Sequence, residues 1–214
     1  MSETKRKCPC CNNYAPNRLV KVKTQYYECD TCKTVFSDPL DNSDMVGGGA
    51  EPERNLLQNP ERIMRLKILA GGNIEGINVL DFGCGFGKLV NDLNAAGFVA
   101  EGYDAYNEDF LTLPKRNYYH AVTMIEVIEH LSAPFVELDC IHRSLVKGGI
   151  VYIETSFTDV AKQENIELEN FEYLNPSVGH STVFSHWGLD VLMAIKGFIP
   201  TTHINRHVRI YIKK

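Results

Sequence analysis

The sequence has no apolar run approaching the roughly 20 residues of a membrane-spanning helix. Its basic N-terminus, MSETKRKCPC, is not followed by the apolar stretch of a secretory signal. It has no internal repeat and no low-complexity tract, and only one of its 214 residues is tryptophan. Ten Phe and ten Tyr still supply enough aromatic area for a sizeable core, which excludes general disorder. We therefore expect a soluble, cytoplasmic protein, one globular domain with some length to spare.

Charge of neither sign dominates, since the formal net charge is −5. Its distribution is uneven, because residues 1–37 carry seven Lys or Arg against three Asp or Glu. The acidic excess lies in the remainder of the chain. An acidic body disfavours a protein whose main task is to bind a nucleic-acid backbone, while the basic head leaves that option open.

The cysteine count is odd, and five of the seven cysteines fall within the first 32 residues. This is a poor disulfide framework for a chain without an export signal. The segments Cys8-Pro-Cys-Cys11 and Cys29-Asp-Thr-Cys32 form two C-x2-C pairs with 17 residues between them. Four thiolates complete a tetrahedral Zn²⁺ site and leave no open coordination position. We predict that these four cysteines hold a structural zinc, with Cys10 either a spare thiol or a replacement for Cys11.

The residues around these pairs show the alternation of a short hairpin, LVKVKTQYYECD, and one further strand at Thr34-Val-Phe36. The pattern resembles a zinc ribbon over residues 1–37, in which the metal replaces the core that so short a segment lacks. Residues 38–52, DPLDNSDMVGGGAEP, are rich in Gly, Asp and Pro, which predicts a linker or mobile loop. Residues 53–214 then form the main domain.

From residue 53 onward helical and strand patterns alternate. A helix, or two broken near Pro60, is expected over 53–70. Strands are expected over 78–82, 98–103, 121–125 and 150–155, and helices over 88–96, 134–146 and 188–196. This alternation predicts an α/β fold with a doubly wound, Rossmann-like, mostly parallel sheet. The last two strands, over 198–205 and 207–212, are expected to close it as an antiparallel pair.

The segment VLDFGCGFG, residues 79–87, joins the first of these strands to a helix. Glycines at such a turn let a ligand approach the backbone closely. Asp81 precedes them and would repel a pyrophosphate, so it suits a positively charged ligand such as the ammonium group of an amino acid. Asp104 ends the next strand, where a carboxylate accepts both hydroxyls of a ribose.

Together these pieces resemble the class I S-adenosylmethionine-dependent methyltransferases. The matching segments are VLDFGCGFG, Asp104, HAVTMIEVIEHL, LVKGGIVYIE and the tail GHSTVFSHWGLDVLMAIKGF. The resemblance implies that Gly83, Cys84 and Gly85 line the methionine part of the cofactor. It also implies that Asp81 lies near the cofactor's ammonium group and that Asp104 holds its ribose.

The chain departs from that family after the second strand. Only 15 residues separate Asp104 from His120, too few for the usual helix and third strand. The segment between Asp104 and His120 is therefore either a shortened βα unit or a loop. Asp109 and Phe110 are candidates for the adenine pocket, and Phe110 is alternatively a core residue.

The segment Glu126-Val-Ile-Glu129-His130 begins where the fourth strand of the family ends, at the ligand-binding edge of such a sheet. If the segment is helical, spacings of three and four place its two carboxylates and imidazole on one face. His180 could add a fourth ligand, and mainly hard ligands suit Mg²⁺ or Mn²⁺.

The motif resembles two methyltransferase groups that bind a metal with such a cluster. These are the ubiquinone-biosynthesis O-methyltransferases and the small-RNA 3′-end 2′-O-methyltransferases. The motif also occurs in class I relatives without a known metal, where the acid faces cofactor or substrate. The sequence is compatible with two interpretations of this cluster, a metal site and a metal-free rim of the active site. In both, the catalytic candidates are Glu126, Glu129, His130 and His180.

Three functions fit these observations. The first is methyl transfer from S-adenosylmethionine to a small-molecule acceptor, with transfer to oxygen slightly favoured. The second is RNA 2′-O-methylation, favoured by the basic ribbon and opposed by the acidic body. The third is a non-enzymatic binding module, opposed by the intact Asp81, glycine turn and Asp104. The first fits best, since such an enzyme mainly aligns the nucleophile and the methyl group in a dry site.

Overall fold

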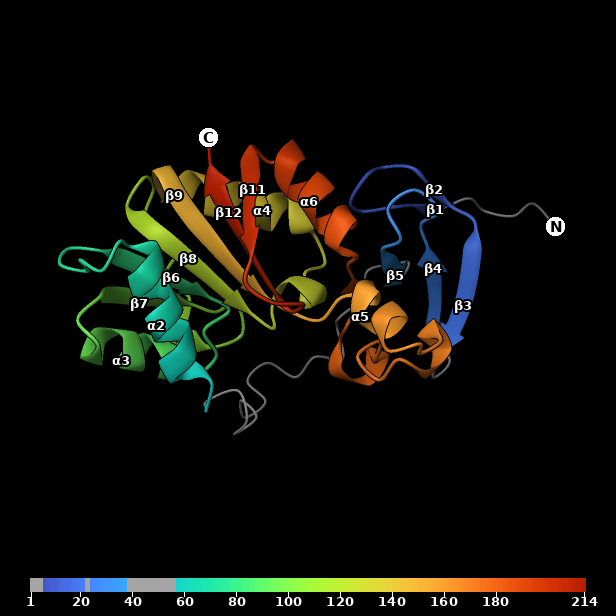
Figure 1. Cartoon of the computed structure of the whole chain (residues 1–214), viewed down its shortest axis with the longest axis horizontal. Coiled ribbons are helices and arrows are strands. Elements are labelled where there is room, and N and C mark those ends of the chain that lie inside the picture. Colours follow the sequence, from blue (N-terminus) through green and yellow to red (C-terminus); the bar gives the residue numbers. More distant parts are fainter. Residues whose placement is uncertain (1–5, 22–23, 38–56) are drawn as a thin grey trace.

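The computed structural model describes residues 6–21, 24–37 and 57–214. Its main feature is a six-stranded sheet of order β11-β12-β9-β8-β6-β7 (Figure 1). The strands β6 (Asn78–Phe82), β7 (Val99–Tyr103), β8 (Tyr119–Ile125) and β9 (Leu145–Glu154) are parallel. The strands β11 (Phe198–His203) and β12 (Val208–Lys213) close the sheet as an antiparallel pair beside β9. The predicted doubly wound α/β fold is confirmed.

Helices cover both faces of this sheet. On one face α2 (Asn59–Leu69) and α3 (Lys88–Ala95) bury Leu66 and Leu93. On the other, α4 (Pro134–Ser144) and α6 (His186–Ile195) bury Leu138 and Leu189. Side chains along β9 and β12 alternate between the two clusters, as the pleat of a strand requires. Within the described residues, no helix is both long and apolar enough to cross a lipid bilayer.

The region after β7 settles one of the sequence alternatives. Residues 104–118 form a loop with one 3₁₀ turn, η1 (Glu108–Phe110), and contain no strand. The family's usual third strand is therefore missing from this part of the chain, as the short spacing between Asp104 and His120 suggested.

Helix α2 begins at Asn59, next to the Pro60 at which the sequence pattern allowed a break. Pro60 lies in its first turn, where a missing backbone N–H costs no hydrogen bond. Residues 53–56 of the expected helix lie outside the described residues. A buried ion pair ties α2 to the end of β9, because Arg62 Nη2 lies 2.5 Å from Glu154 Oε1 and Arg62 Nε lies 3.2 Å from Glu154 Oε2.

The cysteine-rich segment forms the predicted hairpin and third strand. Beside the small pair β1 (Arg6–Lys7) and β2 (Tyr14–Ala15), it contains β3 (Asn17–Lys21), β4 (Thr24–Glu28) and β5 (Val35–Ser37). One strand was not expected. β10 (Thr182–Val183) pairs antiparallel with β5 and completes a four-stranded sheet of order β10-β5-β4-β3.

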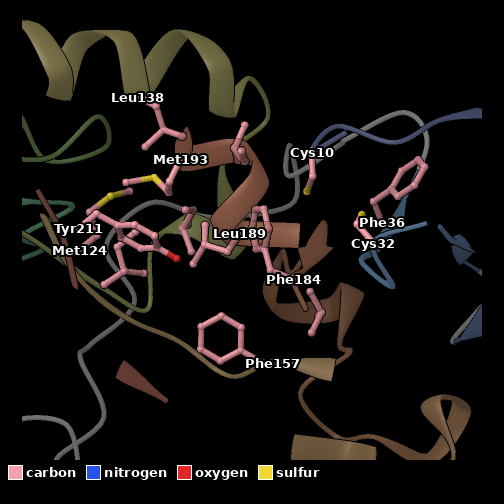
Figure 2. Packing of buried hydrophobic residues seen from close by; sticks show 14 of the residues in the cluster. Cys10, Cys32, Phe36, Met124, Leu138, Phe157, Phe184, Leu189, Met193 and Tyr211 are labelled. Atoms are coloured by element: carbon pink, nitrogen blue, oxygen red, sulfur yellow. The ribbon is translucent and has the colours of Figure 1, made fainter. Parts of the chain in front are cut away.

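The segment that supplies β10 connects β9 to α6. It carries α5 (Thr158–Gln163) and the 3₁₀ turns η3 (Leu168–Asn170) and η4 (Pro176–Val178), and it lies between the main sheet and the ribbon (Figure 1). Figure 2 shows Cys32 and Phe36 of the ribbon in the same buried cluster as Phe184 and Leu189. The ribbon and this face of the main sheet therefore share one core. The expected linker over 38–52 lies outside the described residues.

Candidate active site

The glycine turn between β6 and α3 lies at the carboxyl edge of the sheet. Gly83 has φ +81°, and a Cβ there would lie 2.4 Å from Val127 Cγ2, so the turn needs glycine. Gly85 has φ +54°, but a Cβ there would meet nothing within 4 Å. The backbone at Gly85 therefore borders open space that a ligand can occupy.

Asp104 lies beside this turn, as the resemblance implies. Its Oδ2 accepts a hydrogen bond from the backbone N–H of Gly85 at 2.9 Å, and its Oδ1 accepts one from the N–H of Tyr106 at 2.8 Å. The side chain of Asn107 donates to the carbonyl of Gly85 at 2.8 Å and fixes the loop against the turn. A carboxylate offers about four acceptor positions, so Asp104 retains capacity for the two hydroxyls of a ribose.

The environment of the turn is acidic. The carboxylate of Asp81 is buried and accepts a hydrogen bond from Thr123 Oγ1 on β8 at 2.7 Å. Burial raises the pKa of the Cys84 thiol, and the charges of Asp81 and Asp104 raise it further. Two carboxylates this close to Cys84 favour a ligand that carries positive charge, as a sulfonium or an ammonium group does.

The two adenine-pocket candidates occupy different surroundings. The ring of Phe110 lies across the turn, because a Cβ at Gly87 would be 2.5 Å from Phe110 Cζ and one at Gly102 would be 2.8 Å from Phe110 Cδ1. Phe110 also packs against the cluster under α3. Asp109 is exposed. The position of Phe110 is compatible with both a pocket wall and a core residue.

The E-x-x-E-H segment does not form the helix that would place its acids and imidazole on one face. Glu126 adopts a left-handed conformation with φ +55°, and its N–H bonds to the carbonyl of Glu154 at 2.8 Å. Only one 3₁₀ turn, η2 (Ile128–His130), follows. Tertiary folding nevertheless brings Glu129, His130 and His180 together, with one ligand atom from each within 4.8 Å of the others. Glu126 is not part of this group of three.

Glu129 is fully buried at 0% exposure and is surrounded by hydroxyl groups. Thr155 Oγ1 donates to its Oε2 at 3.0 Å, and the hydroxyl of Tyr173 donates to its Oε1. The Tyr173 hydroxyl also lies 3.0 Å from Glu126 Oε2, so it bridges the two acids of the motif. Burial raises the pKa of Glu129, while nearby His180 and the Tyr173 hydrogen bond act in the opposite direction.

Thr155 and Tyr173 were not predicted as site residues. Thr155 directly follows β9, so the rule that ligands bind at the carboxyl ends of strands could have found it. Tyr173 lies in the irregular segment before β10, and no local pattern singles it out.

The two histidines of the cluster are oriented by backbone carbonyls. Nδ1 of His130 lies 3.1 Å from the carbonyl oxygen of Gly179, and Nδ1 of His180 lies 2.5 Å from that of Tyr173. Burial lowers the pKa of both imidazoles, which favours their neutral form. With the proton on Nδ1 directed at a carbonyl, Nε2 becomes the atom that can bind a cation.

The four cysteines of the C-x2-C pairs converge. Their sulfur atoms all lie within 4.8 Å of one another, with 3.4 Å between Cys8 and Cys32 and 3.6 Å between Cys11 and Cys29. Zn–S bonds of about 2.3 Å in a tetrahedron require sulfur atoms about 3.8 Å apart. The donor set therefore fits zinc. Cys10 is not one of these four, although its thiol interacts with those of Cys8 and Cys32. It donates to Thr34 Oγ1 at 3.5 Å, and burial raises its pKa.

Many solved structures resemble this fold, among them three methyltransferases. A 1,6-didemethyltoxoflavin-N1-methyltransferase from Burkholderia thailandensis is 14% identical, with a TM-score of 0.59 over 92% of this chain and 98% of its own. An S-adenosylmethionine-dependent methyltransferase from Methanosarcina mazei is 16% identical, with a TM-score of 0.51 over 68% and 96%. A magnesium protoporphyrin IX methyltransferase from Synechocystis is 17% identical, with a TM-score of 0.50 over 75% and 84%. At these identities the likeness concerns the fold.

Sequence comparison gives the family. No curated protein matches the chain significantly. Residues 55–202 match the methyltransferase domain family, and this range covers more than half of the chain. The chain therefore belongs to the methyltransferase domain family, and it shares its fold with S-adenosylmethionine-dependent methyltransferases.

Proposed function

We propose that this protein transfers the methyl group of S-adenosylmethionine to a hydroxyl oxygen of a small molecule. The observation that carries the proposal is the adjacency of two half-sites at one edge of the sheet. The acidic glycine turn follows β6, and the buried Glu129 cluster follows the neighbouring strand β8. The structure from B. thailandensis holds S-adenosylhomocysteine and 1,6-didemethyltoxoflavin, which supports a small-molecule acceptor.

The first half-site holds the cofactor in this proposal. Asp81 lies near its ammonium group, and Gly83, Cys84 and Gly85 line its methionine part. Asp104 accepts the ribose hydroxyls with the acceptor capacity described above. In this proposal Asp109 and Phe110 are the residues nearest the adenine ring.

The second half-site holds the acceptor. Glu126, the partly exposed acid of the motif, can accept a hydrogen bond and so favours an acceptor group that donates one. The acceptor oxygen attacks the methyl carbon, the carbon–sulfur bond breaks to give S-adenosylhomocysteine, and the hydroxyl proton passes to a neighbouring base. Glu126 is half-buried at the rim of the cluster and is our candidate for that base.

The same cluster offers a donor set for a divalent cation. One carboxylate oxygen and two imidazole nitrogens, from Glu129, His130 and His180, suit Mn²⁺ better than Mg²⁺. When bound, such an ion lowers the pKa of a hydroxyl group and orients it. Mn²⁺ binding that is lost in His180→Ala would support this assignment.

The ribbon cysteines form a separate, structural site. Cys8, Cys11, Cys29 and Cys32 hold one zinc ion in this proposal, with no coordination position left for substrate. The zinc stabilises the ribbon over residues 1–37 and does not contact the reacting groups.

An RNA acceptor is the alternative, because the E-x-x-E-H cluster fits a ribose 2′-hydroxyl and the ribbon is basic. The acidic body of the chain opposes it. Binding to RNA that weakens steeply as salt is raised would favour this alternative, because it would report release of counterions from phosphates.

Calorimetry of S-adenosylmethionine binding tests the proposal. We expect the wild-type protein to bind the cofactor and Asp104→Ala to bind it more than about tenfold more weakly, since hydrogen bonds to a charged group contribute about 1.5–3 kcal/mol. The control is Glu108→Ala, an exposed acid of the same loop, which should bind as the wild type does. Near-wild-type affinity of Asp104→Ala would remove the ribose assignment. A wild-type protein that binds no cofactor would contradict the function itself.

A further inference from the structure

The acceptor-side cluster is attached to the cysteine ribbon by a buried hydrogen bond. Tyr26 lies on β4 of the ribbon and is 0% exposed. Its hydroxyl donates to the backbone carbonyl of His180 at 2.7 Å, across 154 positions of sequence. One end of the His180 peptide is thereby fixed by a ribbon side chain, while its imidazole lies against Glu129 and His130.

A second connection runs through the residue after His180. The N–H and the hydroxyl of Ser181 both donate to the carbonyl of Glu129, at 3.0 and 3.2 Å. The carbonyl of Ser181 in turn accepts from the N–H of Ser37, at the end of β5, at 2.8 Å. Ser181 is therefore held between the ribbon and the peptide of Glu129. The pairing of β10 with β5 continues the same contact for two more residues.

A third contact lies at the second C-x2-C pair. The hydroxyl of Ser185 donates to the carbonyl of Cys32, and Thr158 Oγ1 donates to the carbonyl of Lys33 at 3.1 Å. A Cβ at Gly188 of α6 would lie 2.0 Å from Thr34 Oγ1, so the helix packs directly on this loop. Figure 2 shows Cys32 close to Phe184 and Leu189 in the shared core.

From these contacts we infer that the zinc-loaded ribbon positions the acceptor half of the active site. This inference rests on the zinc site and the methyltransferase function proposed above. The metal fixes the loop of Cys29 and Cys32, and this loop fixes β4 and β5. These strands fix His180 through Tyr26 and Glu129 through Ser181. The cofactor half depends on other contacts, since Asp104 and Gly85 are held by residues 103–110.

Hydrogen exchange measured by mass spectrometry tests the inference on the full-length protein. Chelation should release one zinc per chain, counted by elemental analysis. Amide exchange should then rise at least about tenfold in 126–131 and 176–185, as well as in the ribbon. Residues 78–110 should keep their protection and the cofactor its affinity, and reloading with zinc should reverse the change. A rise confined to residues 6–37, or one that includes 78–110, would overturn the inference.

A matched pair of variants separates positioning from general stability. Tyr26→Phe keeps the ring and removes only the hydroxyl, so it should retain zinc and cofactor binding. It should raise exchange in 176–185 and shift the imidazole resonances of His180 in the NMR spectrum. Tyr27→Phe is the control, because the Tyr27 hydroxyl contacts Gln25 within the ribbon. Equal spectra and equal exchange in the two variants would contradict the positioning role of Tyr26.

The outcomes of these experiments distinguish the zinc site, the methyltransferase function and the positioning role of the ribbon from one another. A wild-type protein without zinc contradicts the metal site, and one that binds no S-adenosylmethionine contradicts the function. A protein that binds both, yet shows no link between zinc and the exchange of 176–185, contradicts only this inference.

Discussion

At the scale of single residues, the buried carboxylate of Asp81 accepts a hydrogen bond from a side chain of the neighbouring strand. Thr123 lies on the neighbouring strand β8 and donates to Asp81 Oδ1. A buried charge without such a partner costs far more than one that is hydrogen-bonded. Thr123 therefore holds the acid in the orientation that the cofactor's ammonium group would meet.

Thr123→Val should expose this dependence, because valine has nearly the same shape and lacks the hydroxyl. We expect it to lower the free energy of unfolding by about 1.5–3 kcal/mol and to weaken S-adenosylmethionine binding. Urea unfolding and calorimetry measure the two effects. Thr123→Ser retains the hydroxyl and should behave closer to the wild type. Equal stability of Thr123→Val and the wild type would show that Asp81 does not need this bond.

Single site residues could be predicted where the chemistry is local in sequence. Asp81 lies near the end of β6, and Gly85 and Asp104 follow the ends of β6 and β7, so their proximity was foreseeable from one βαβ unit. Tyr173 and Tyr26 contribute through contacts with residues far away in the sequence. Their side chains look like ordinary core aromatics until the fold brings them to Glu129 and His180.

At the scale of elements, Gly85 of the glycine turn can be compared with Gly148 of β9, which has a similar backbone conformation. Gly85 and Gly148 have φ +54° and +75°, and a Cβ at either would meet no atom within 4 Å. Substitution by alanine at either position costs a similar backbone strain, about 1 kcal/mol. The two positions differ in place, since Gly85 lies in the cofactor turn and Gly148 lies near the start of β9, at the opposite edge of the sheet.

We therefore expect Gly85→Ala and Gly148→Ala to lower the melting temperature by similar amounts, while only Gly85→Ala weakens S-adenosylmethionine binding. The added methyl group would occupy space beside the cofactor. Thermal unfolding and calorimetry on both variants check this. If the two bind the cofactor equally well, the open space at Gly85 is not the cofactor site.

The elements themselves were largely predictable because hydrophobic period and turn residues are local signals. The order of strands and helices from β6 to β12 follows the expected alternation, and the missing third strand followed from the spacing before His120. The helical alternative considered for residues 126–130 does not occur, because Glu126 is left-handed and its backbone N–H bonds to the carbonyl of Glu154. β10 was missed because a strand of two residues is too short to show a hydrophobic period. Its pairing with β5 is decided by the tertiary fold.

At the scale of the whole molecule, the ribbon and the methyltransferase domain are not packed as independent units. Buried residues from Cys8 to Phe36 belong to the same cluster as buried residues of β8, α4, α6 and β12. This is the face of the sheet opposite to α2 and α3 (Figure 1). Disruption of the ribbon would therefore expose apolar surface on the main domain, and the two parts should unfold together.

We accordingly expect one cooperative transition when the zinc-loaded protein is heated in a calorimeter, with equal calorimetric and van't Hoff enthalpies. Partial loosening after chelation is compatible with this result, since exchange under native conditions detects local openings well below global unfolding. The independent comparison is a fragment that starts at residue 57. It lacks the ribbon that covers Phe184 and Leu189, so it should bind hydrophobic dyes and melt without a sharp transition. Two separable transitions in the full chain, or a well-folded fragment, would show that the shared core contributes little to the stability of the main domain.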